Sequence, residues 1–413
     1  MGYFKTAVHS ISWAAAERWL YRGLTFVRVA ILARILLPAQ FGIFNIATLT
    51  LGLLEVFTET AINFFLIQKK GDIDSYIDTA WVISILRGLV ISLILLIGAP
   101  LISSFYHSPG SLPVLYLVCL VSFVRGFINP SIVKLQKELH FKWEFHINTF
   151  LYLADSVTAI ILAIVLHNPL SLGFGMLIGA VFEVAVSFWL FSPRPRFVYT
   201  ARKAAEILEQ GKWMTAAGIF QYLYLNGDNM VVGKMLGETS LGYYDYAYKI
   251  STSPVSEVSD VVARVSFPVF VQINHDPARL KRAFFKTTLI VSAVSVAFGL
   301  ILFFFAHPVV FIVLGAKWAP AIPALKVLSL CGIAKSVTGC VYPLLLAVRR
   351  NDYVSWVTLV SVFGLGISIY PLVMAFGIVG AGIAAIIGSF ASLPLSLYYV
   401  NRIFSHPQIY HEA

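Results

Sequence analysis

Ionisable side chains recur at helical spacing inside an otherwise apolar stretch of this sequence, residues 242–271. They share one face of the expected helix, within an arc of roughly 120° at about 100° per residue. The polar residues on this face are Asp245, Lys249, Ser253, Ser256, Glu257, Asp260 and Arg264. An ionisable group inside a spanning helix costs about 2.5–3.5 kcal/mol, so it usually faces protein or water and marks a functional surface. This face therefore predicts one wall of a hydrated passage.

A second polar face runs along residues 42–66, within an arc of roughly 80°. It contains Asn45, Thr48, Gly52, Glu55, Glu59 and Asn63. Asn45 and Asp245 occupy equivalent positions, and Glu59 falls close to the equivalent of Asp260. The two faces are predicted to form opposite walls of one cavity. Candidate sites for a coupling proton or sodium ion are the carboxylates Glu55, Glu59, Asp228, Asp245, Glu257 and Asp260.

Arginines mark the first apolar stretch, residues 12–36. Arg18 and Arg22 lie one helical turn apart on one face, whereas Arg28 lies about 80° away and could pair with Glu17 or line a neighbouring wall. Paired guanidinium groups are suited to bidentate binding of phosphate oxygens. The alternative is that Arg18 and Arg22 extend to the headgroups at the membrane surface.

Several other ionisable residues stand isolated in apolar stretches of the sequence. They are Arg87, Arg125, Asp155, Glu183, Asp228, Lys326 and Lys335. The expected role of each is that of a structural partner or of a side chain that extends to the headgroups. Asp228 is the strongest functional candidate among them, because it lies deep in its stretch beside Asn226 and Asn229.

The amino-acid composition indicates that these ionisable residues lie on transmembrane helices. Of 413 residues, 59% are hydrophobic and 12% are charged, and the mean hydropathy is +0.82, whereas soluble proteins contain about 25% charged residues. We predict an all-α integral membrane protein. Runs of about 20 apolar residues can cross a bilayer as a helix, and they predict about twelve transmembrane helices, at residues 12–36, 42–66, 79–105, 112–133, 146–167, 170–192, 212–233, 242–271, 285–314, 321–347, 353–375 and 377–401.

Basic residues concentrate in alternate predicted loops, such as 134–142, 194–203 and 279–286. Loops that remain in the cytoplasm retain Lys and Arg. Both termini of this multi-pass protein are therefore predicted to lie on the cytoplasmic side of the inner membrane. The formal net charge of +10 is interpreted as an orientation signal, and no nucleic acid is expected as a partner.

The sequence contains no nucleotide-binding loop, dinucleotide fingerprint or metal-ligand spacing, and its three cysteines are scattered through apolar runs. We expect no catalytic residue, no metal, no cofactor and no disulfide. Coupling to the membrane potential, to a proton or to sodium remains open.

Two short patterns occur twice, about two hundred residues apart. RILLPAQFGIF at 34–44 resembles KMLGETSLGYY at 234–244, and LPVLYLV at 112–118 resembles IPALKVL at 322–328. Each copy of the first pattern is predicted to form the outer turn of a helical hairpin. Duplication of six helices predicts two parallel repeats that form two bundles around a central cavity.

The repeats predict where the domains begin and end. An N-terminal six-helix bundle is expected at 1–193 and a C-terminal bundle at 212–413. Residues 194–211 are expected to be a cytoplasmic linker with a short amphipathic helix that lies on the membrane surface. The apolar face of this helix contains Ala204, Ile207 and Leu208.

Three stretches carry a family pattern: FVRVAILARILLPAQFGIFNIA at 26–47, FLIQKKGDID at 65–74 and LNGDNMVVGKMLGETSLGYYDYAYKISTSP at 225–254. They resemble the oligosaccharide and polysaccharide flippases of the multidrug/oligosaccharidyl-lipid/polysaccharide (MOP) exporter superfamily. The resemblance implies a non-enzymatic transporter that moves a polyprenyl-diphosphate-linked oligosaccharide from the cytoplasmic to the outer leaflet by alternating access. It implies surface polysaccharide assembly as the pathway, with membrane lipid and other polysaccharide-assembly proteins as partners.

The resemblance also implies that cationic residues of the cavity bind the diphosphate. The candidate substrate-binding residues are Arg18, Arg22, Arg28, Asn45, Lys249 and Arg264. Two other functions remain open. A cation-coupled multidrug antiporter of the same superfamily would use acidic cavity residues, although the arginines of the first helix would repel cationic drugs. A membrane glycosyltransferase or polymerase would usually need a sizeable outer loop with catalytic residues, and the predicted outer loops are short.

Overall fold

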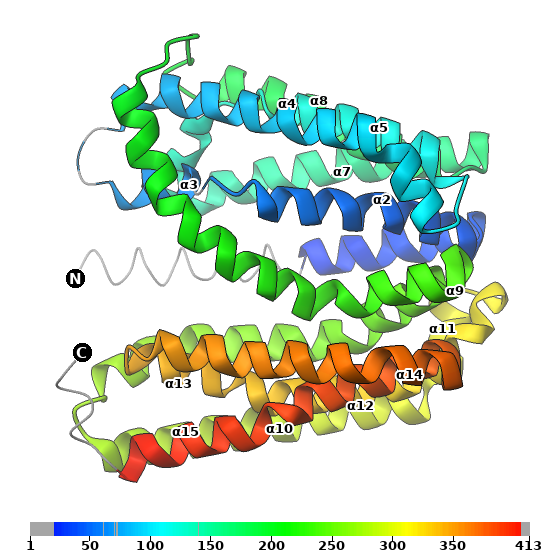
Figure 1. Ribbon diagram of the computed structural model, residues 1–413, viewed down its shortest axis with the longest axis vertical. Helices are drawn as coiled ribbons and strands as arrows, with labels where there is room; N and C mark the ends of the chain where they lie inside the picture. Colours follow the sequence, from blue (N-terminus) through cyan, green and yellow to red (C-terminus); the bar gives the residue numbers. More distant parts are fainter. Residues whose placement is uncertain (1–19, 61, 70, 72, 139, 406–413) are drawn as a thin grey trace. The chain divides into compact units, whose positions relative to one another are not determined.

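The computed structural model describes residues 20–60, 62–69, 71, 73–138 and 140–405. Every regular element within these residues is helical, and no strand occurs among them (Figure 1). Seven of the described helices are long and apolar enough to cross a membrane, or eight if one bent pair counts as a span. The predicted all-α membrane class is confirmed. The chain divides into two compact units, Met1–Ile219 (the first unit) and Phe220–Ala413 (the second unit).

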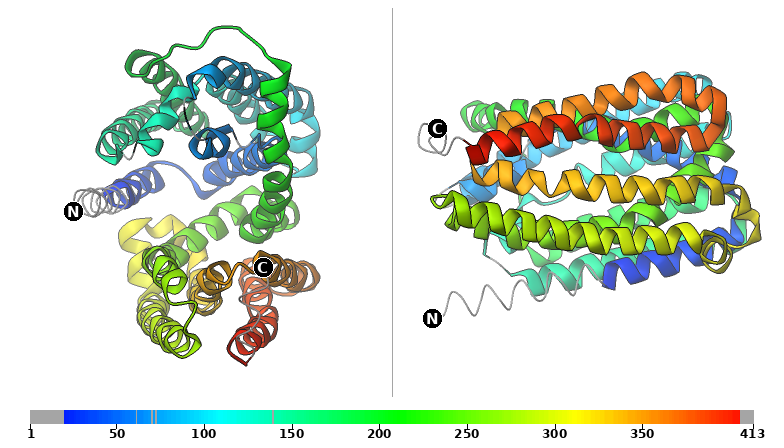
Figure 2. Two further views of the ribbon diagram at one scale, coloured as in Figure 1. Left: turned by 90° about the vertical axis from the view of Figure 1, so that its left-hand side faces the viewer. Right: turned by 90° about the horizontal axis from the view of Figure 1, so that it is seen from below.

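The first unit is a bundle of packed helices. It contains a helix over residues 20–35, then α2 (Pro38–Phe57), α3 (Ile62–Gln68), α4 (Asp74–Phe105), α5 (Ser111–Arg125), η1 (Pro130–Val133), α6 (Lys134–Lys137), α7 (Phe141–Leu166) and α8 (Leu170–Leu190). Helix α4 packs on α5, α5 on α8 and α8 on α7 (Figure 2). Ile43 and Leu51 of α2 share a buried core with Val114 and Val118 of α5. This core holds α2 against α5 and so positions the carboxylates near the end of α2.

Helices α4 and α5 approach closely at Gly88 and Gly126. A Cβ added to Gly88 would lie 2.8 Å from the backbone oxygen of Ser122 and 2.9 Å from the Cα of Gly126. The two backbones are therefore in direct contact, as small residues allow between membrane helices. Each glycine directly follows an arginine, Arg87 or Arg125. The crossing thus brings two arginines together on neighbouring helices.

We expect Gly88→Ala to destabilise the first unit by about 1–3 kcal/mol, because the added methyl group forces the α5 backbone away. Gly98→Ala on the same helix is the matched control. An added Cβ there meets only Ile102 Cδ1, at 3.6 Å, and alanine favours a helix over glycine by up to about 1 kcal/mol. Thermal unfolding of the two purified variants measures the difference. Equal midpoints would show that α5 moves aside without cost.

Both copies of the repeated pattern contain a break between helices. In the first copy, α2 begins after Leu37, whose extended backbone precedes Pro38. In the second copy, Gly237 has φ 80° and ψ 178°, a conformation that is essentially restricted to glycine. The predicted turns therefore occur, at Leu37 and Gly237. The repeated glycines, Gly42 and Gly242, lie inside helices instead.

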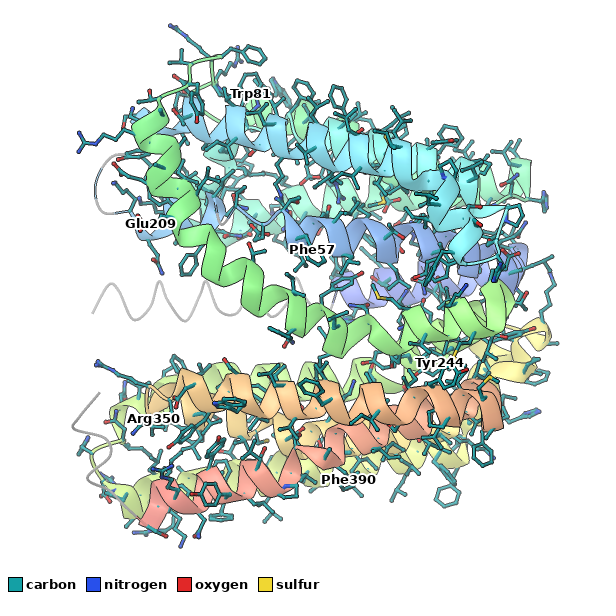
Figure 3. All side chains as sticks on the ribbon, viewed as in Figure 1. Phe57, Trp81, Glu209, Tyr244, Arg350 and Phe390 are labelled. Atoms are coloured by element: carbon teal, nitrogen blue, oxygen red, sulfur yellow. The ribbon has the colours of Figure 1, made fainter. Side chains whose placement is uncertain are left out.

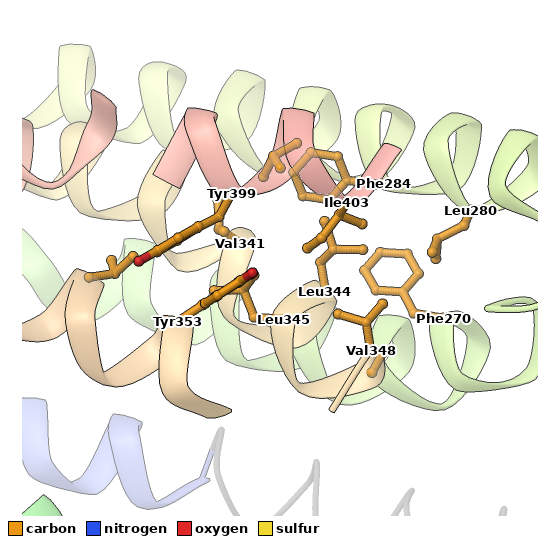
Figure 4. Close-up of a cluster of buried hydrophobic side chains, with 13 residues drawn as sticks. Phe270, Leu280, Phe284, Val341, Leu344, Leu345, Val348, Tyr353, Tyr399 and Ile403 are labelled. Atoms are coloured by element: carbon orange, nitrogen blue, oxygen red, sulfur yellow. The ribbon is translucent and has the colours of Figure 1, made fainter. Parts of the chain in front are cut away.

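Helix α9 (Ala201–Gln272) begins in the first unit and continues into the second. The second unit also contains α10 (Pro277–Phe304), α11 (Ala306–Val313), η2 (Ala316–Ala321), α12 (Ile322–Gly339), α13 (Val341–Ala347), α14 (Asn351–Ala391) and α15 (Leu393–Ser405). Helix α12 packs on α10 and α14. A buried cluster that includes Phe284, Leu344, Tyr353 and Tyr399 joins α10, α13, α14 and α15 (Figure 4). The rings of Tyr353 and Tyr399 stack at 3.8 Å, which fixes α14 against α15.

Five predicted spans are each divided between two helices in the described residues: 42–66, 112–133, 285–314, 321–347 and 377–401. In the predicted span 112–133, α5 ends at Arg125, and the segment Pro130–Lys137 runs at 74° to it. Pro130 lacks the N–H that a continuing helix needs, so the chain bends here. The predicted span 377–401 is divided between α14 and α15. The total of twelve spans, the domain boundaries at 193 and 212 and the cavity between the bundles stay predictions.

The first residues of α9 form the predicted linker helix. Ala204 and Ile207 are 1% and 0% exposed and share a buried cluster with Phe65 of α3 and Ile77 of α4. Leu208 is exposed. Most of the apolar face therefore packs on protein, which differs from the expected helix on lipid. The apolar residues of α3 and α4 provide the surface that this face needs to leave water.

Polar contacts hold the same linker helix. Glu206 Oε2 accepts hydrogen bonds from Lys69 Nζ at 3.0 Å and from Tyr76 OH at 2.8 Å. The bonds from Lys69 and Tyr76 lower the pKa of Glu206. Hydrogen bonds to Tyr76 and Glu206 raise the pKa of Lys69. The linker contact is thus an ion pair that holds its charges over a wide pH range.

We expect this contact to weaken only in strong acid or strong base. The pKa of Glu206 is lower in the folded protein than its ordinary value of 4.5. The stability that this carboxylate contributes is therefore fully present above pH 4.5 and is lost as the pH falls through the pKa of the folded state. The pKa of Lys69 is higher in the folded protein than its ordinary value of 10.5. The stability that this ammonium group contributes is therefore fully present below pH 10.5 and is lost as the pH rises through the pKa of the folded state. Residues 201–209 should be better protected from hydrogen exchange in the wild type than in Glu206→Gln, and the ratio of the two protection factors should not change between about pH 4.5 and pH 10.5. A factor that changes near neutral pH would assign the contact to another group.

Candidate functional site

The first unit contains a polar cavity of about 270 Å³ lined by residues of α2, α4, α5 and α8 and of the turn after α2. Its charged lining residues are Glu55, Glu59, Arg87, Arg125 and Glu183. Gly88 and Gly126 line it as well, so the helix crossing directly positions both arginines. Three carboxylates and two guanidinium groups therefore share a space that can hold several water molecules.

Arg87 is bound to the end of α2. Its Nη2 donates to the backbone oxygen of Glu55 at 2.8 Å, and its Nε donates to Thr58 Oγ1 at 3.3 Å. The same Nη2 lies 3.6 Å from Glu59 Oε2. A helix C-terminus leaves carbonyl oxygens without helical partners, so a guanidinium group is favourable there. Arg87 thus fixes the turn that carries Glu59.

Arg125 and Glu183 form a looser pair in the same cavity. Arg125 Nε lies 3.7 Å from Glu183 Oε2, beyond hydrogen-bond distance, and it is buried without a hydrogen-bond partner. Thr60 also lines the cavity, is 9% exposed, and its buried Oγ1 has no hydrogen-bond partner. A buried polar group without a partner costs about 1–3 kcal/mol. The cavity therefore has polar atoms available for a further ligand.

Arg28 makes a two-pronged ion pair with Asp155 of α7. The distances are 2.7 Å from Nη1 to Oδ2 and 3.0 Å from Nη2 to Oδ1. The guanidinium group also lies 5.6 Å from the ring centre of Tyr152. Gly175 of α8 makes room for this pair, since a Cβ there would lie 2.6 Å from Asp155 Oδ1. Arg28 is therefore held inside the first unit by a partner that neither sequence alternative had named.

A polar network joins α9 and α12 in the second unit, and Tyr244 of this network is labelled in Figure 3. Tyr244 OH donates to Asp228 Oδ2 at 2.8 Å, and Lys335 Nζ donates to Tyr248 OH at 2.6 Å. Lys335 Nζ also lies 5.0 Å from the ring centre of Tyr224. Asp228 and Tyr244 are 2% and 0% exposed, and Asp228 interacts electrostatically with Lys335. A buried carboxyl group and a partly buried ammonium group thus belong to one network, and each has a tyrosine hydroxyl as its hydrogen-bond partner.

Asn45 and Asp245, the equivalent residues of the two polar faces, are both buried, at 7% and 5% exposure. Asp245 Oδ2 binds Lys249 Nζ at 2.6 Å, and Lys249 is largely exposed. Asn45 Nδ2 is buried without a hydrogen-bond partner. Asn45 belongs to the first unit and Asp245 to the second. That the two polar faces form opposite walls of one cavity stays a prediction.

Four other predicted site residues fall outside the part of the chain that the structure describes. Arg18 precedes the first described residue, and the described side chains do not include those of Glu257, Asp260 and Arg264. Arg22 is exposed on the helix over residues 20–35.

Four residues that stand isolated in the sequence each have an ion-pair partner in the structure, which agrees with the expected role of a structural partner. They are Arg87, Arg125, Asp155 and Glu183. Each partner lies on another segment of the chain, and helical periodicity does not predict which segments pack against each other. The role of Arg87, Arg125 and Glu183 in a shared cavity was missed. The Arg-Gly dipeptide occurs at 22–23, 87–88 and 125–126. It was a partial signal, because Gly88 and Gly126 lie at a close helix crossing, whereas Gly23 has no neighbour within 4 Å.

Sequence comparison assigns residues 31–323 to a family described as polysaccharide biosynthesis protein. The lipopolysaccharide biosynthesis protein WzxC of Escherichia coli is 26% identical over 358 residues, which cover 85% of this chain and 72% of WzxC. The family match includes the cavity of the first unit and Asp228, Tyr244 and Tyr248 of the second unit, and it ends before Lys335.

Solved structures share the fold at low sequence identity. The lipid II flippase MurJ in an inward closed conformation superposes with a TM-score of 0.75 at 14% identity, covering 95% of this chain and 87% of MurJ. An inward-facing multidrug resistance MATE family transporter of the MOP superfamily superposes with a TM-score of 0.70 at 15% identity, covering 94% of this chain and 95% of the transporter. This chain therefore belongs to the polysaccharide biosynthesis protein family and has the fold of MOP superfamily transporters.

Proposed function

We propose that this protein moves a polyprenyl-diphosphate-linked oligosaccharide from the cytoplasmic to the outer leaflet of the inner membrane by alternating access. One observation carries the proposal: a chain of a polysaccharide biosynthesis family has a transporter fold over nearly its whole length. WzxC is named for lipopolysaccharide biosynthesis, and the MurJ structure is titled as a lipid II flippase. Movement of a lipid-linked precursor accounts for both similarities.

The diphosphate of such a substrate needs cationic partners. Arg18 and Arg22 lie one helical turn apart, and the exposed position of Arg22 supports a role in bidentate binding of phosphate oxygens. The exposed Lys249 of α9 is a further candidate. Arg28 is already bound by both oxygens of Asp155. We therefore assign Arg28 to positioning of its helix rather than to the diphosphate.

Membrane voltage can supply a driving force. An inside-negative potential favours outward movement of negative charge by about 2.3 kcal/mol per charge per 100 mV. With both termini in the cytoplasm, as the basic loops predict, outward movement of the diphosphate follows this gradient.

The proposal is tested by native mass spectrometry of the full-length protein after mild extraction from its own membrane. We expect a co-purifying lipid-linked glycan in the wild type and its loss in Arg18→Ala/Arg22→Ala. The matched control is Arg279→Ala/Arg282→Ala, which removes two positive charges from exposed positions on α10 and should retain the glycan.

The outcomes test the transport function separately from the assignment of Arg18 and Arg22 to the diphosphate site. A glycan that is retained in both double variants would leave the function in place and return Arg18 and Arg22 to contacts with headgroups. No lipid-linked glycan in any sample, together with drug resistance on overexpression, would favour a cation-coupled multidrug antiporter.

A further inference from the structure

The loop between α8 and α9, residues 191–200, lines an open pocket apart from the cavity described above (Figure 1). The pocket has a volume of about 800 Å³ and is lined by residues 189–196 together with Asp74, Ser75 and Asp78 of α4. Ligand sites usually occupy about 300–1,000 Å³. The pocket lies where α4 begins and α8 ends, and both helices are long and apolar enough to cross a membrane. We therefore expect it at the depth of the lipid headgroups.

Hydrogen bonds to two other segments fix the backbone of this loop. The backbone oxygen of Pro193 accepts from Ser131 Oγ at 2.8 Å and from Asn129 Nδ2 at 3.2 Å. Asp78 Oδ1 accepts the backbone N–H of Arg196 at 2.8 Å. A loop whose basic residues served only to orient the protein in the membrane would need no fixed backbone. These bonds instead hold the arginines of the loop beside α4.

Arg194 and Arg196 give the pocket a surplus of positive charge. Lys134 Nζ lies 2.7 Å from Asp74 Oδ1 and neutralises that carboxylate. Asp78 offsets one of the two arginines, so that one positive charge remains. Both arginines are exposed. Arg194 Nε donates to a backbone oxygen in the last turn of α8 at 3.1 Å, and its two Nη groups have no partner among the residues that the structure describes. A phosphate diester carries the single negative charge that this surplus favours.

Exposed apolar side chains flank the two arginines in the sequence. Trp189 and Phe197 are 78% and 75% exposed, and Tyr199 is 56% exposed. Trp189 and Leu190 also line the pocket. Tryptophan and tyrosine are common at the boundary between lipid and water, where an apolar ring meets lipid while its polar atom stays hydrated. A soluble anion would use the arginines alone and would leave these rings in water.

We propose that this pocket binds one anionic phospholipid, with its phosphate on Arg194 and Arg196 and its acyl chains along Trp189 and Leu190. With the orientation that the basic loops predict, this lipid belongs to the cytoplasmic leaflet. Helix α9 begins directly after the loop, so the bound lipid holds the start of the linker helix at the membrane surface. The binding of this lipid does not rest on the proposed function.

The test is native mass spectrometry of the purified full-length protein in detergent micelles. Phosphatidylglycerol or phosphatidylcholine with the same acyl chains is added. We expect the wild type to retain one phosphatidylglycerol molecule in preference to phosphatidylcholine, because the choline group places a positive charge near the arginines. Arg194→Ala/Arg196→Ala should weaken phosphatidylglycerol binding by about tenfold or more. The control Arg279→Ala/Arg282→Ala removes two positive charges from exposed positions on α10 and should bind as the wild type does.

Two further measurements separate a lipid from free phosphate. Trp189→Ala removes apolar surface without a change of charge and should weaken phosphatidylglycerol binding by a few-fold, and excess inorganic phosphate should not displace the lipid. Displacement by phosphate, or full binding by Trp189→Ala, would assign the pocket to a soluble anion and overturn the inference. Equal binding by the wild type and Arg194→Ala/Arg196→Ala would overturn it too, as would an equal loss in the α10 control. None of these results changes the test for a co-purifying glycan.

Discussion

Asp228→Ala destabilises the second unit by about 3–5 kcal/mol, as expected when one member of a buried charged network is removed. The change leaves the hydroxyl of Tyr244 without its acceptor, at 0% exposure, and removes the carboxylate that interacts electrostatically with Lys335. For a unit of this size, the loss corresponds to a fall of roughly 10 °C in the unfolding midpoint. Thermal unfolding of the purified protein measures it.

Two comparisons separate the charge from the hydrogen bond. Asp352→Ala removes an exposed carboxylate from the first turn of α14 and should cost at most about 1 kcal/mol. Lys335→Met/Asp228→Asn removes both charges and should cost less than the sum of the single changes, because neither charge is left alone in the unit. Strict additivity would show that the two charges act independently.

Arg28→Met and Asp155→Asn are expected to show strong coupling in a double-mutant cycle. Each single change leaves one charge without its partner at membrane depth, whereas the double change leaves none. The side chains are 15% and 22% exposed, so we expect an interaction free energy of about 1–3 kcal/mol, below the cost of breaking a fully buried pair. Unfolding midpoints of the four proteins measure this interaction.

The surface pair Arg279 and Asp276 is the matched control for this cycle. Its side chains are 69% and 38% exposed and 4.0 Å apart, so its coupling should not exceed about 1 kcal/mol. The charge exchange Arg28→Asp/Asp155→Arg gives a further test. Gly175 and Gly179 lie against Asp155, and a longer side chain would collide with them. A stable exchanged protein would contradict the role of these glycines.

The membrane fold was predictable because its signals are local. A long apolar run has to be helical in lipid, where every backbone N–H and C=O needs an internal partner. The breaks near Leu37 and Gly237 were also predictable from the repeated pattern. The end of α5 was harder to place, because a bend at Gly126 and Pro130 leaves the apolar run uninterrupted in sequence.

The sequence by itself determined which residues are charged at membrane depth, and on which helix each one lies. Only the tertiary structure decided their partners. Arg28 meets Asp155 across 127 positions, and Arg125 meets Glu183 on another helix. Helical periodicity gives the direction of a side chain relative to its own helix, whereas its neighbours depend on which helices cross and at what distance. Here the contact between Gly88 and Gly126 brought the arginines of two helices into one cavity, because two backbones can touch only where no side chain separates them.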